Sequence, residues 1–94
     1  MTQEERKEML EAIDLAMHEI IKEFGRASNK YPSFNSAHEG FAVILEEVDE
    51  LKAEVWKNRA ARTKEAMRRE ACQVAAMAFR FIVDCCGKDR RDDK

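Results

Sequence analysis

Apolar side chains recur at intervals of three and four residues along three long stretches of this chain. Such spacing is typical of helices that bury one face. The first stretch spans residues 2–24, the second begins at Ser36 and ends near Asn58, and the third follows Thr63 and ends near Cys86. The sequence therefore predicts an all-α fold with three main helices.

The predicted helices have recognisable ends. Gly25 is placed to stop the first helix, and residues 25–35, which contain Gly, Asn, Pro and Ser, are predicted to form a loop. Ser36 and Glu39 match a capping box, and Thr63 is a predicted N-cap. The expected buried stripes are Met9, Leu10, Ile13, Met17, Ile20, Ile21 and Phe24 in the first helix, and Phe41, Ile44, Val48, Leu51 and Val55 in the second.

A chain of 94 residues forms one small domain with a modest core. We assign residues 1–87 to a single helical domain and residues 88–94 to a charged tail that does not pack. The third helix is apolar almost all round between Ala71 and Val83, and two neighbouring helices cannot cover every side of it. The expected architecture is therefore a helical bundle that is completed by oligomerisation.

Charge and composition narrow the classes of function. The net charge is −2 and no long basic block occurs, which argues against nucleic acid as the main partner. The charged N-terminus has no apolar signal segment, and the longest apolar run is too short for a bilayer, so we expect a cytoplasmic protein with no membrane partner. The cysteines, Cys72, Cys85 and Cys86, lack C-x-x-C spacing and are expected to be reduced packing residues rather than zinc ligands.

Acidic residues are concentrated on the second predicted helix. Five carboxylates fall between Glu46 and Glu54, and like charges three or four residues apart repel by about 0.2–0.5 kcal/mol per pair. At about 100° per residue, Glu46 points to solvent, whereas Glu47, Glu50 and Glu54 cluster on one flank of the apolar stripe. Taken alone, this pattern is most simply a solvated helix face.

The third helix changes this interpretation. Its polar residues between positions 70 and 84 share one side of the helix: Glu70, Gln73, Arg80 and Asp84. Buried polar groups need partners, so this stripe is either an internal network, such as Arg80 with Asp84 or Glu70, or the wall of a site. In an antiparallel hairpin, Glu47 and Glu50 face the stripe, and oxygen pairs one turn apart on two helices suit Mg2+.

The motif pair has a counterpart in a known family. EEVDE (residues 46–50), followed after 19 residues by EACQ (residues 70–73), resembles the E-E-x-x-E and E-x-x-D signature of the all-α, MazG-like nucleoside triphosphate pyrophosphohydrolases. Residues 34–83 are particularly similar to the small phage and prophage type. The resemblance implies an enzyme that hydrolyses an NTP or dNTP to the monophosphate and pyrophosphate. It also implies Mg2+, with Mn2+ as a substitute, and a homodimer or a dimer-of-dimers tetramer.

The resemblance assigns roles to particular residues. Glu47, Glu50 and Glu70 match the catalytic, metal-binding carboxylates of the family. Gln73 replaces the aspartate of E-x-x-D, so it offers a carbonyl ligand without a charge and cannot act as a base. We therefore expect weaker metal binding, and an activity that is weaker, needs more Mg2+, is confined to particular nucleotides or is lost.

Four residues are expected near the substrate: Arg80, His38, Lys57 and Glu54. Arg80 is chosen because a buried guanidinium is costly without a fixed anion. Surface or capping use is the alternative for His38, and solubilising charge is the alternative for the basic group Lys57, Arg59 and Arg62. Trp56 and Tyr31 are candidates to stack on a base or to pack.

Two other functions remain open at the level of sequence. One is a nucleotide-binding sensor that does not hydrolyse its ligand. The other is a structural helical interaction module in which the carboxylates have no chemical task.

Overall fold

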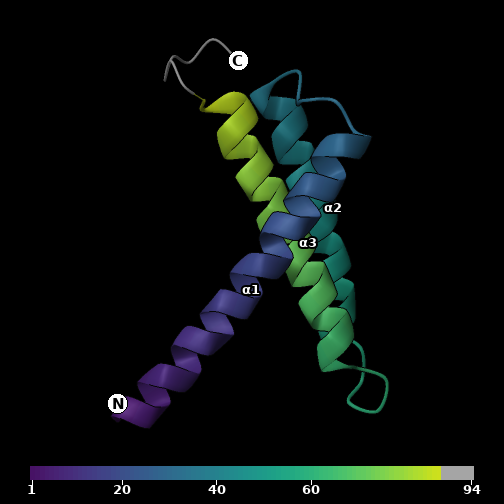
Figure 1. Cartoon of the computed structure of the whole chain (residues 1–94). Coiled ribbons are helices and arrows are strands. Elements are labelled where there is room, and N and C mark those ends of the chain that lie inside the picture. The colour runs from purple at the N-terminus through teal and green to yellow at the C-terminus, as the bar shows by residue number, and fades with distance from the viewer. Residues whose placement is uncertain (88–94) are drawn as a thin grey trace.

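The computed structural model describes residues 1–87 and contains three helices (Figure 1). They are α1 (Gln3–Lys30), α2 (Ala37–Val55) and α3 (Lys64–Cys85). No strand occurs among these 87 residues, so the predicted all-α class with three main helices is confirmed. The predicted tail at residues 88–94 lies outside the described residues.

Each helix begins at a polar cap. The Thr2 hydroxyl accepts from the Glu5 amide, and the Glu5 carboxylate accepts from the Thr2 amide, which completes a capping box. At α2, the Ser36 hydroxyl accepts from the Glu39 amide at 3.1 Å as predicted, but the Glu39 carboxylate accepts from the Asn35 amide rather than from Ser36. The predicted Thr63 cap of α3 is confirmed.

Helix α1 is longer than predicted, because it continues through Gly25 to Lys30. A glycine inside a helix costs only about 1 kcal/mol, which favourable neighbours can offset. Arg26 pairs with Glu23 one turn earlier, and the helix ends where Tyr31, which precedes Pro32, takes an extended conformation. The predicted end of α2 near Asn58 is also wrong, since that helix ends at Val55.

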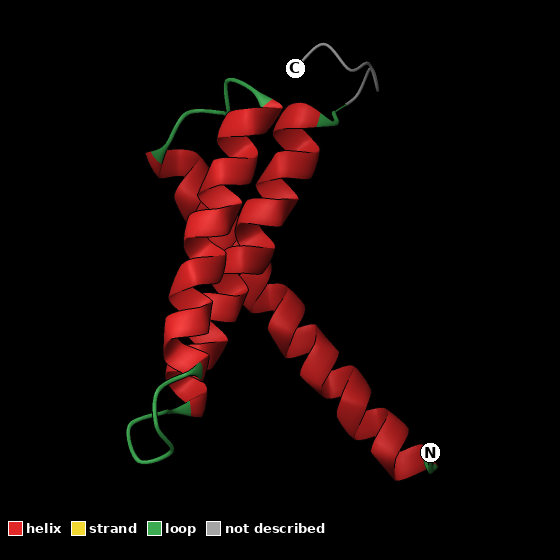
Figure 2. Ribbon diagram, turned by 180° about the vertical axis from the view of Figure 1, so that it is seen from behind, coloured by secondary structure: helices red, strands yellow, loops and turns green. Residues whose placement is uncertain are grey.

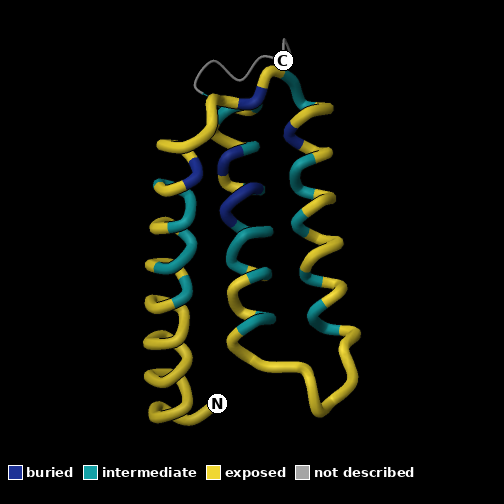
Figure 3. Tube along the Cα trace, turned by 90° about the vertical axis from the view of Figure 1, so that its right-hand side faces the viewer, coloured by how far each residue is buried: buried dark blue, intermediate teal, exposed yellow. Residues whose placement is uncertain are grey.

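Helix α3 lies between the other two helices (Figure 3). α2 and α3 form an antiparallel hairpin, whereas α1 crosses α3 and makes no close backbone approach to α2. Beyond the crossing, the N-terminal half of α1 extends away from the hairpin (Figure 2). The part of α1 that shapes the rest of the molecule is therefore its C-terminal half.

The core lies near the loop between α1 and α2. Its buried members are Ala27, Phe34, Ala76 and Met77, and Phe24, Val43, Ile44, Phe81 and Cys85 pack against them. Phe24 and Phe79 meet edge to face with ring centroids 4.8 Å apart. This cluster fixes the C-terminal half of α1 and the loop against the hairpin.

Much of the predicted apolar surface is exposed in the single chain. Every residue of α1 before Ala16 is exposed, because this half of the helix has diverged from α3. On α2, Phe41 and Val48 are exposed, since α2 meets α3 through its Gly40, Val43 and Ile44 side instead. The exposed large side chains of the predicted stripes and of the apolar part of α3 are Met9, Leu10, Ile13, Met17, Ile21, Phe41, Val48, Phe79, Ile82 and Val83.

Helix α3 is thus not buried on all sides within one chain, and its coverage by a partner stays a prediction. Only Ala76, Met77 and Arg80 of this helix are buried. No helix within residues 1–87 is long and apolar enough to cross a membrane. The cellular location stays a prediction.

Gly40 allows the closest approach between α2 and the core. A Cβ at this position would lie 2.7 Å from Cδ2 of Phe81 and 2.9 Å from Cδ2 of Phe34. Both distances are too short for carbon atoms in contact. The absence of a side chain at position 40 therefore lets the two aromatic rings sit directly against the helix.

We predict that Gly40→Ala destabilises the protein by about 1–3 kcal/mol, because overpacking outweighs the helix propensity of alanine. Urea unfolding at a fixed protein concentration measures the effect. Gly25→Ala is the matched control, since a Cβ there has no atom within 4 Å, and it should stabilise α1 by up to about 1 kcal/mol. Equal midpoints for the two variants would contradict the close packing at Gly40.

Candidate functional site

Three carboxylates from two helices meet on one side of the hairpin. Glu47 and Glu50 lie one turn apart on α2, and Glu70 lies on the facing side of α3. One oxygen from each residue lies within 4.8 Å of the others. Helix spacing supplies the first pair, whereas the third oxygen arrives only because α2 and α3 run antiparallel. Such a cluster has the separations that a single cation can bridge.

Gln73 lies one turn after Glu70 and closes the cluster. When its amide nitrogen faces the carboxylates, it donates to Oε2 of Glu47 at 2.9 Å and to Oε2 of Glu70 at 3.2 Å. In the opposite orientation, the carbonyl oxygen faces only acceptors. The first orientation satisfies the hydrogen bonds of the protein alone. The second orientation presents four oxygen atoms from two helices as possible metal ligands, and such a ligand set suits Mg2+.

Burial and mutual repulsion perturb the acids. The pKa of Glu47 is raised to about 7, first by burial, then by its hydrogen bond with Glu50 and by the charges of Glu50, Glu70 and Glu23. Burial, followed by the charge of Glu50, also raises the pKa of Glu70. The packing therefore holds these carboxylates where a proton, an amide donor or a cation relieves their repulsion.

A cavity of about 550 Å³ adjoins the cluster. Its apolar walls include Ala27, Phe34, Val43 and Met77, and Tyr31 and Pro32 contribute from the loop. Acidic side chains outnumber basic ones in the lining, which holds Glu23, Glu39, Glu46, Glu47 and Glu50 against Arg26 and Arg80. The cavity is therefore lined by both carboxylates and apolar side chains.

The sequence reasoning missed the contribution of α1. Glu23, Arg26 and Ala27 all line the cavity, but residues 25–35 were predicted to be a loop. The spacing of Glu23 and Arg26, which is typical of an ion pair on a helix, was the available signal. It favours a continuous helix through Gly25.

Arg80 is the most buried of the predicted substrate-binding residues. Its side chain is 4% exposed and its Nη2 donates to the carbonyl oxygens of Pro32 at 2.8 Å and Tyr31 at 3.5 Å. The guanidinium carbon lies 4.6 Å from the centre of the Phe34 ring. Asp84 lies 4.0 Å from Arg80 and accepts from the Phe34 amide at 3.0 Å. Arg80 and Asp84 thus clamp the loop to α3, which is the internal network that the sequence left open.

The other predicted substrate-binding residues do not line this cavity. His38 is exposed in the first turn of α2. Glu54 continues the acidic row by one turn and holds Lys57 at 2.8 Å. Of the remaining link residues, Arg62 donates to the carbonyl oxygen of Val55 at 3.3 Å. Trp56 is exposed and lies under the Lys52 ammonium rather than in the cavity.

Comparison of the chain with protein-family models, with curated proteins and with solved structures finds no significant match.

Without a bound cation, we predict that the raised pKa of Glu47 makes stability fall with rising pH. Its usual pKa is 4.5 and its folded-state pKa is about 7, so folding favours the protonated form. This contribution is complete below the usual pKa and is lost as the pH rises through about 7. Thermal unfolding in EDTA should give a higher Tm at about pH 5 than at about pH 8.

Glu47→Gln should flatten this pH dependence, because the amide cannot titrate. Asp49→Asn is the control, since Asp49 is an exposed acid on the same helix outside the cluster. If Glu47→Gln and Asp49→Asn change the pH profile equally, repulsion at the cluster is not its source.

Proposed function

We propose that this protein is a Mg2+-dependent, MazG-like nucleoside triphosphate pyrophosphohydrolase. One observation carries the proposal: oxygen ligands from α2 and α3 converge beside a cavity large enough for a small molecule. Carboxylates that serve only as a solvent-exposed helix face do not need to converge with carboxylates of a second helix. The similarity of residues 46–50 and 70–73 to the signature of the family supports the same reading.

The donor set fits the proposed ion. Glu47, Glu50 and Glu70 supply carboxylate oxygens, and the carbonyl oxygen of Gln73 completes the set when the amide turns. All four are hard oxygen ligands of the kind that Mg2+ prefers, and Mn2+ accepts the same set. When bound, Mg2+ neutralises the carboxylates, screens the phosphates and increases the acidity of a water molecule.

The side chains of the protein have separate tasks in this scheme. Glu50 is the exposed member of the cluster, so it can both hold the ion and accept a proton from an attacking water. The water oxygen forms a bond to the α-phosphorus, the bond from this phosphorus to the bridging oxygen breaks, and pyrophosphate leaves. Phe34, Val43 and Met77 give the cavity an apolar wall against which the nucleoside can pack.

The two alternatives make different demands on the same residues. A nucleotide sensor needs the cavity and the ion but no turnover, so nucleotide with Mg2+ would raise the Tm without releasing pyrophosphate. A structural module needs neither the cavity nor the ion. Replacing Glu50 or Glu70 by alanine would then relieve repulsion without loss of function. The cavity beside the cluster favours a ligand-binding protein over the structural module.

Assembly of at least two chains is part of the proposal. The exposed apolar side chains on α1 include Leu10, which is 57% exposed, and Met17, which is 53% exposed. A face of this kind is usually covered in solution. A homodimer or a dimer of dimers would cover it, and would also supply the cover that α3 lacks.

Pyrophosphate release from a panel of NTPs and dNTPs with Mg2+ tests the activity. We expect hydrolysis by the wild type and a loss of about 10- to 100-fold in Glu50→Gln, because the amide is a weaker ligand and no base. Asp49→Asn should keep the wild-type rate. A background rate that is equal in the wild type and Glu50→Gln would end the enzyme interpretation.

Replacement of Gln73 tests the composition of the ion site. Gln73→Asp adds one negative charge, so we expect Mg2+ to bind about tenfold more tightly by calorimetry. In EDTA the same variant should have a lower Tm, because it loses the amide donor between Glu47 and Glu70 and adds repulsion. Gln73→Leu, which has no ligand atom, should bind Mg2+ more weakly than the wild type. Unchanged affinity in Gln73→Asp would place the ion elsewhere.

A further inference from the structure

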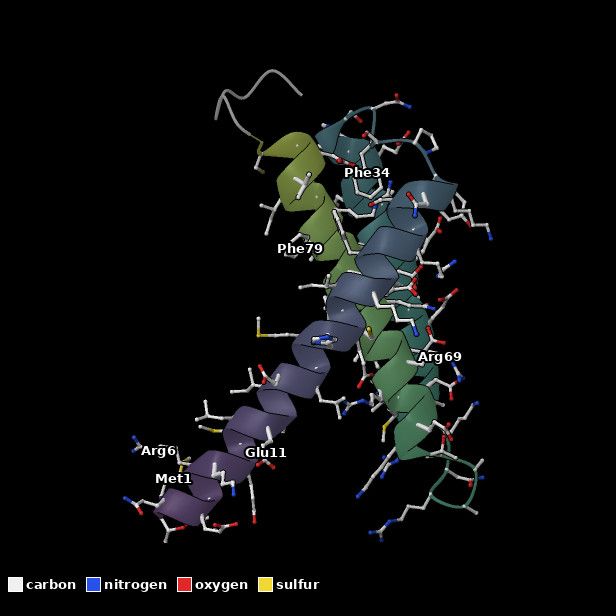
Figure 4. All side chains as sticks on the ribbon, viewed as in Figure 1. Met1, Arg6, Glu11, Phe34, Arg69 and Phe79 are labelled. Carbon is white, nitrogen blue, oxygen red and sulfur yellow. The ribbon has the colours of Figure 1, made fainter. Side chains whose placement is uncertain are left out.

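A groove of about 530 Å³, distinct from the cavity, lies between α1 and α3. It meets the cavity at three residues that line both: Glu23, Arg26 and Gln73. The two spaces therefore adjoin at Gln73, which contacts Glu47 and Glu70 of the carboxylate cluster. Figure 4 shows the labelled Arg69, which lines the groove, on the N-terminal half of α3.

The two spaces have opposite charge. Four basic residues line the groove, Lys22, Arg26, Arg68 and Arg69, against three acidic ones. The cavity holds five acidic and two basic residues. A polyanion would be repelled by the cavity, except where a cation is bound, but would be attracted by the adjoining groove.

Two of the basic residues are already engaged. The Arg68 guanidinium donates to both carboxylate oxygens of Glu19 and so ties α3 to α1. Arg26 donates to both carboxylate oxygens of Glu23. Both of these cations contribute to the electrostatic potential of the groove, but each is held in a hydrogen-bonded ion pair.

The other two are accessible to a ligand. The Arg69 side chain is 62% exposed, and its ion pair with Glu70 is long, with 4.0 Å between Nε and Oε1. Lys22 is exposed and makes no ion pair within residues 1–87. Arginine and lysine are the residues that bind phosphate oxygens, the first in a bidentate manner and the second as a point charge.

We propose that the groove binds the β- and γ-phosphates of a nucleoside triphosphate, with Lys22 and Arg69 as the contacting cations. This placement rests on the proposed function. It puts the α-phosphate at the junction beside Gln73, which contacts Glu47 and Glu70, and the nucleoside in the partly apolar cavity. The pyrophosphate product then leaves along the groove, where Lys22 and Arg69 offset its negative charge.

Calorimetry with tripolyphosphate and Mg2+ tests the groove without requiring turnover or knowledge of the base. We expect Lys22→Gln/Arg69→Gln to weaken binding of tripolyphosphate about tenfold, since it removes both accessible cations. Binding of Mg2+ alone should be undiminished, because the carboxylate ligands are unchanged.

The matched control is Arg6→Gln/Lys7→Gln, which removes one arginine and one lysine from the exposed N-terminal half of α1 (Figure 4). It should bind tripolyphosphate as the wild type does. Equal weakening in the control and in the groove variant would indicate a general charge effect and would overturn the proposal. Loss of Mg2+ binding in the groove variant would also overturn it, because the change would then act through the carboxylate cluster.

The results separate this proposal from the proposed function. NTP hydrolysis by the wild type, with unchanged tripolyphosphate affinity in the groove variant, would overturn the groove alone. Absence of hydrolysis, with tripolyphosphate binding that depends on Lys22 and Arg69, would overturn the enzyme and support the groove as a polyphosphate site.

Discussion

The packing of α2 against α3 brings the carboxylates of Glu47, Glu50 and Glu70 within reach of one another, and the other features of the candidate site depend on that. Separation would remove the repulsion, but the antiparallel hairpin and the close contact at Gly40 hold the two helices together. The repulsion is expressed in the raised pKa of Glu47 and in the amide of Gln73 that bridges Glu47 and Glu70. The positive end of the Gln73 amide dipole thus lies against the carboxylates of Glu47 and Glu70.

The second constraint is the clamp that Arg80 and Asp84 place on the loop between α1 and α2. Arg80 donates to the carbonyl oxygens of the loop, and Asp84 accepts from the Phe34 amide. Because the loop is tied to α3, the C-terminal half of α1 is brought over the hairpin, where Glu23 and Arg26 reach the cavity and the groove. Arg80, which was predicted to bind the substrate, thereby helps to shape the candidate site by positioning the loop between α1 and α2.

Parts of this arrangement could be predicted because they depend on spacing along one helix. The caps at Ser36 and Thr63, the pairing of Glu47 with Glu50 and the polar stripe of α3 are of this kind. Phe41 and most of the apolar stripe of α1 are exposed in the single chain, because periodicity identifies an apolar face without identifying what covers it. Lys57 and Glu54, which were both expected near the substrate, pair with each other in the structure and do not line the cavity.

The sequence by itself determined the three helices, their polar starts and which acidic residues share a helix face. These features are local, since they are set by hydrogen bonds and side-chain spacing within a few turns. The approach of Glu70 and Gln73 to Glu47 was predicted from the antiparallel hairpin, and the structure brings these residues together. Only the tertiary structure decided that the C-terminal half of α1 lines the cavity and that basic side chains gather in a groove beside the acids. Those outcomes depend on the angle and depth at which whole helices pack, and no spacing along a single helix contains that information.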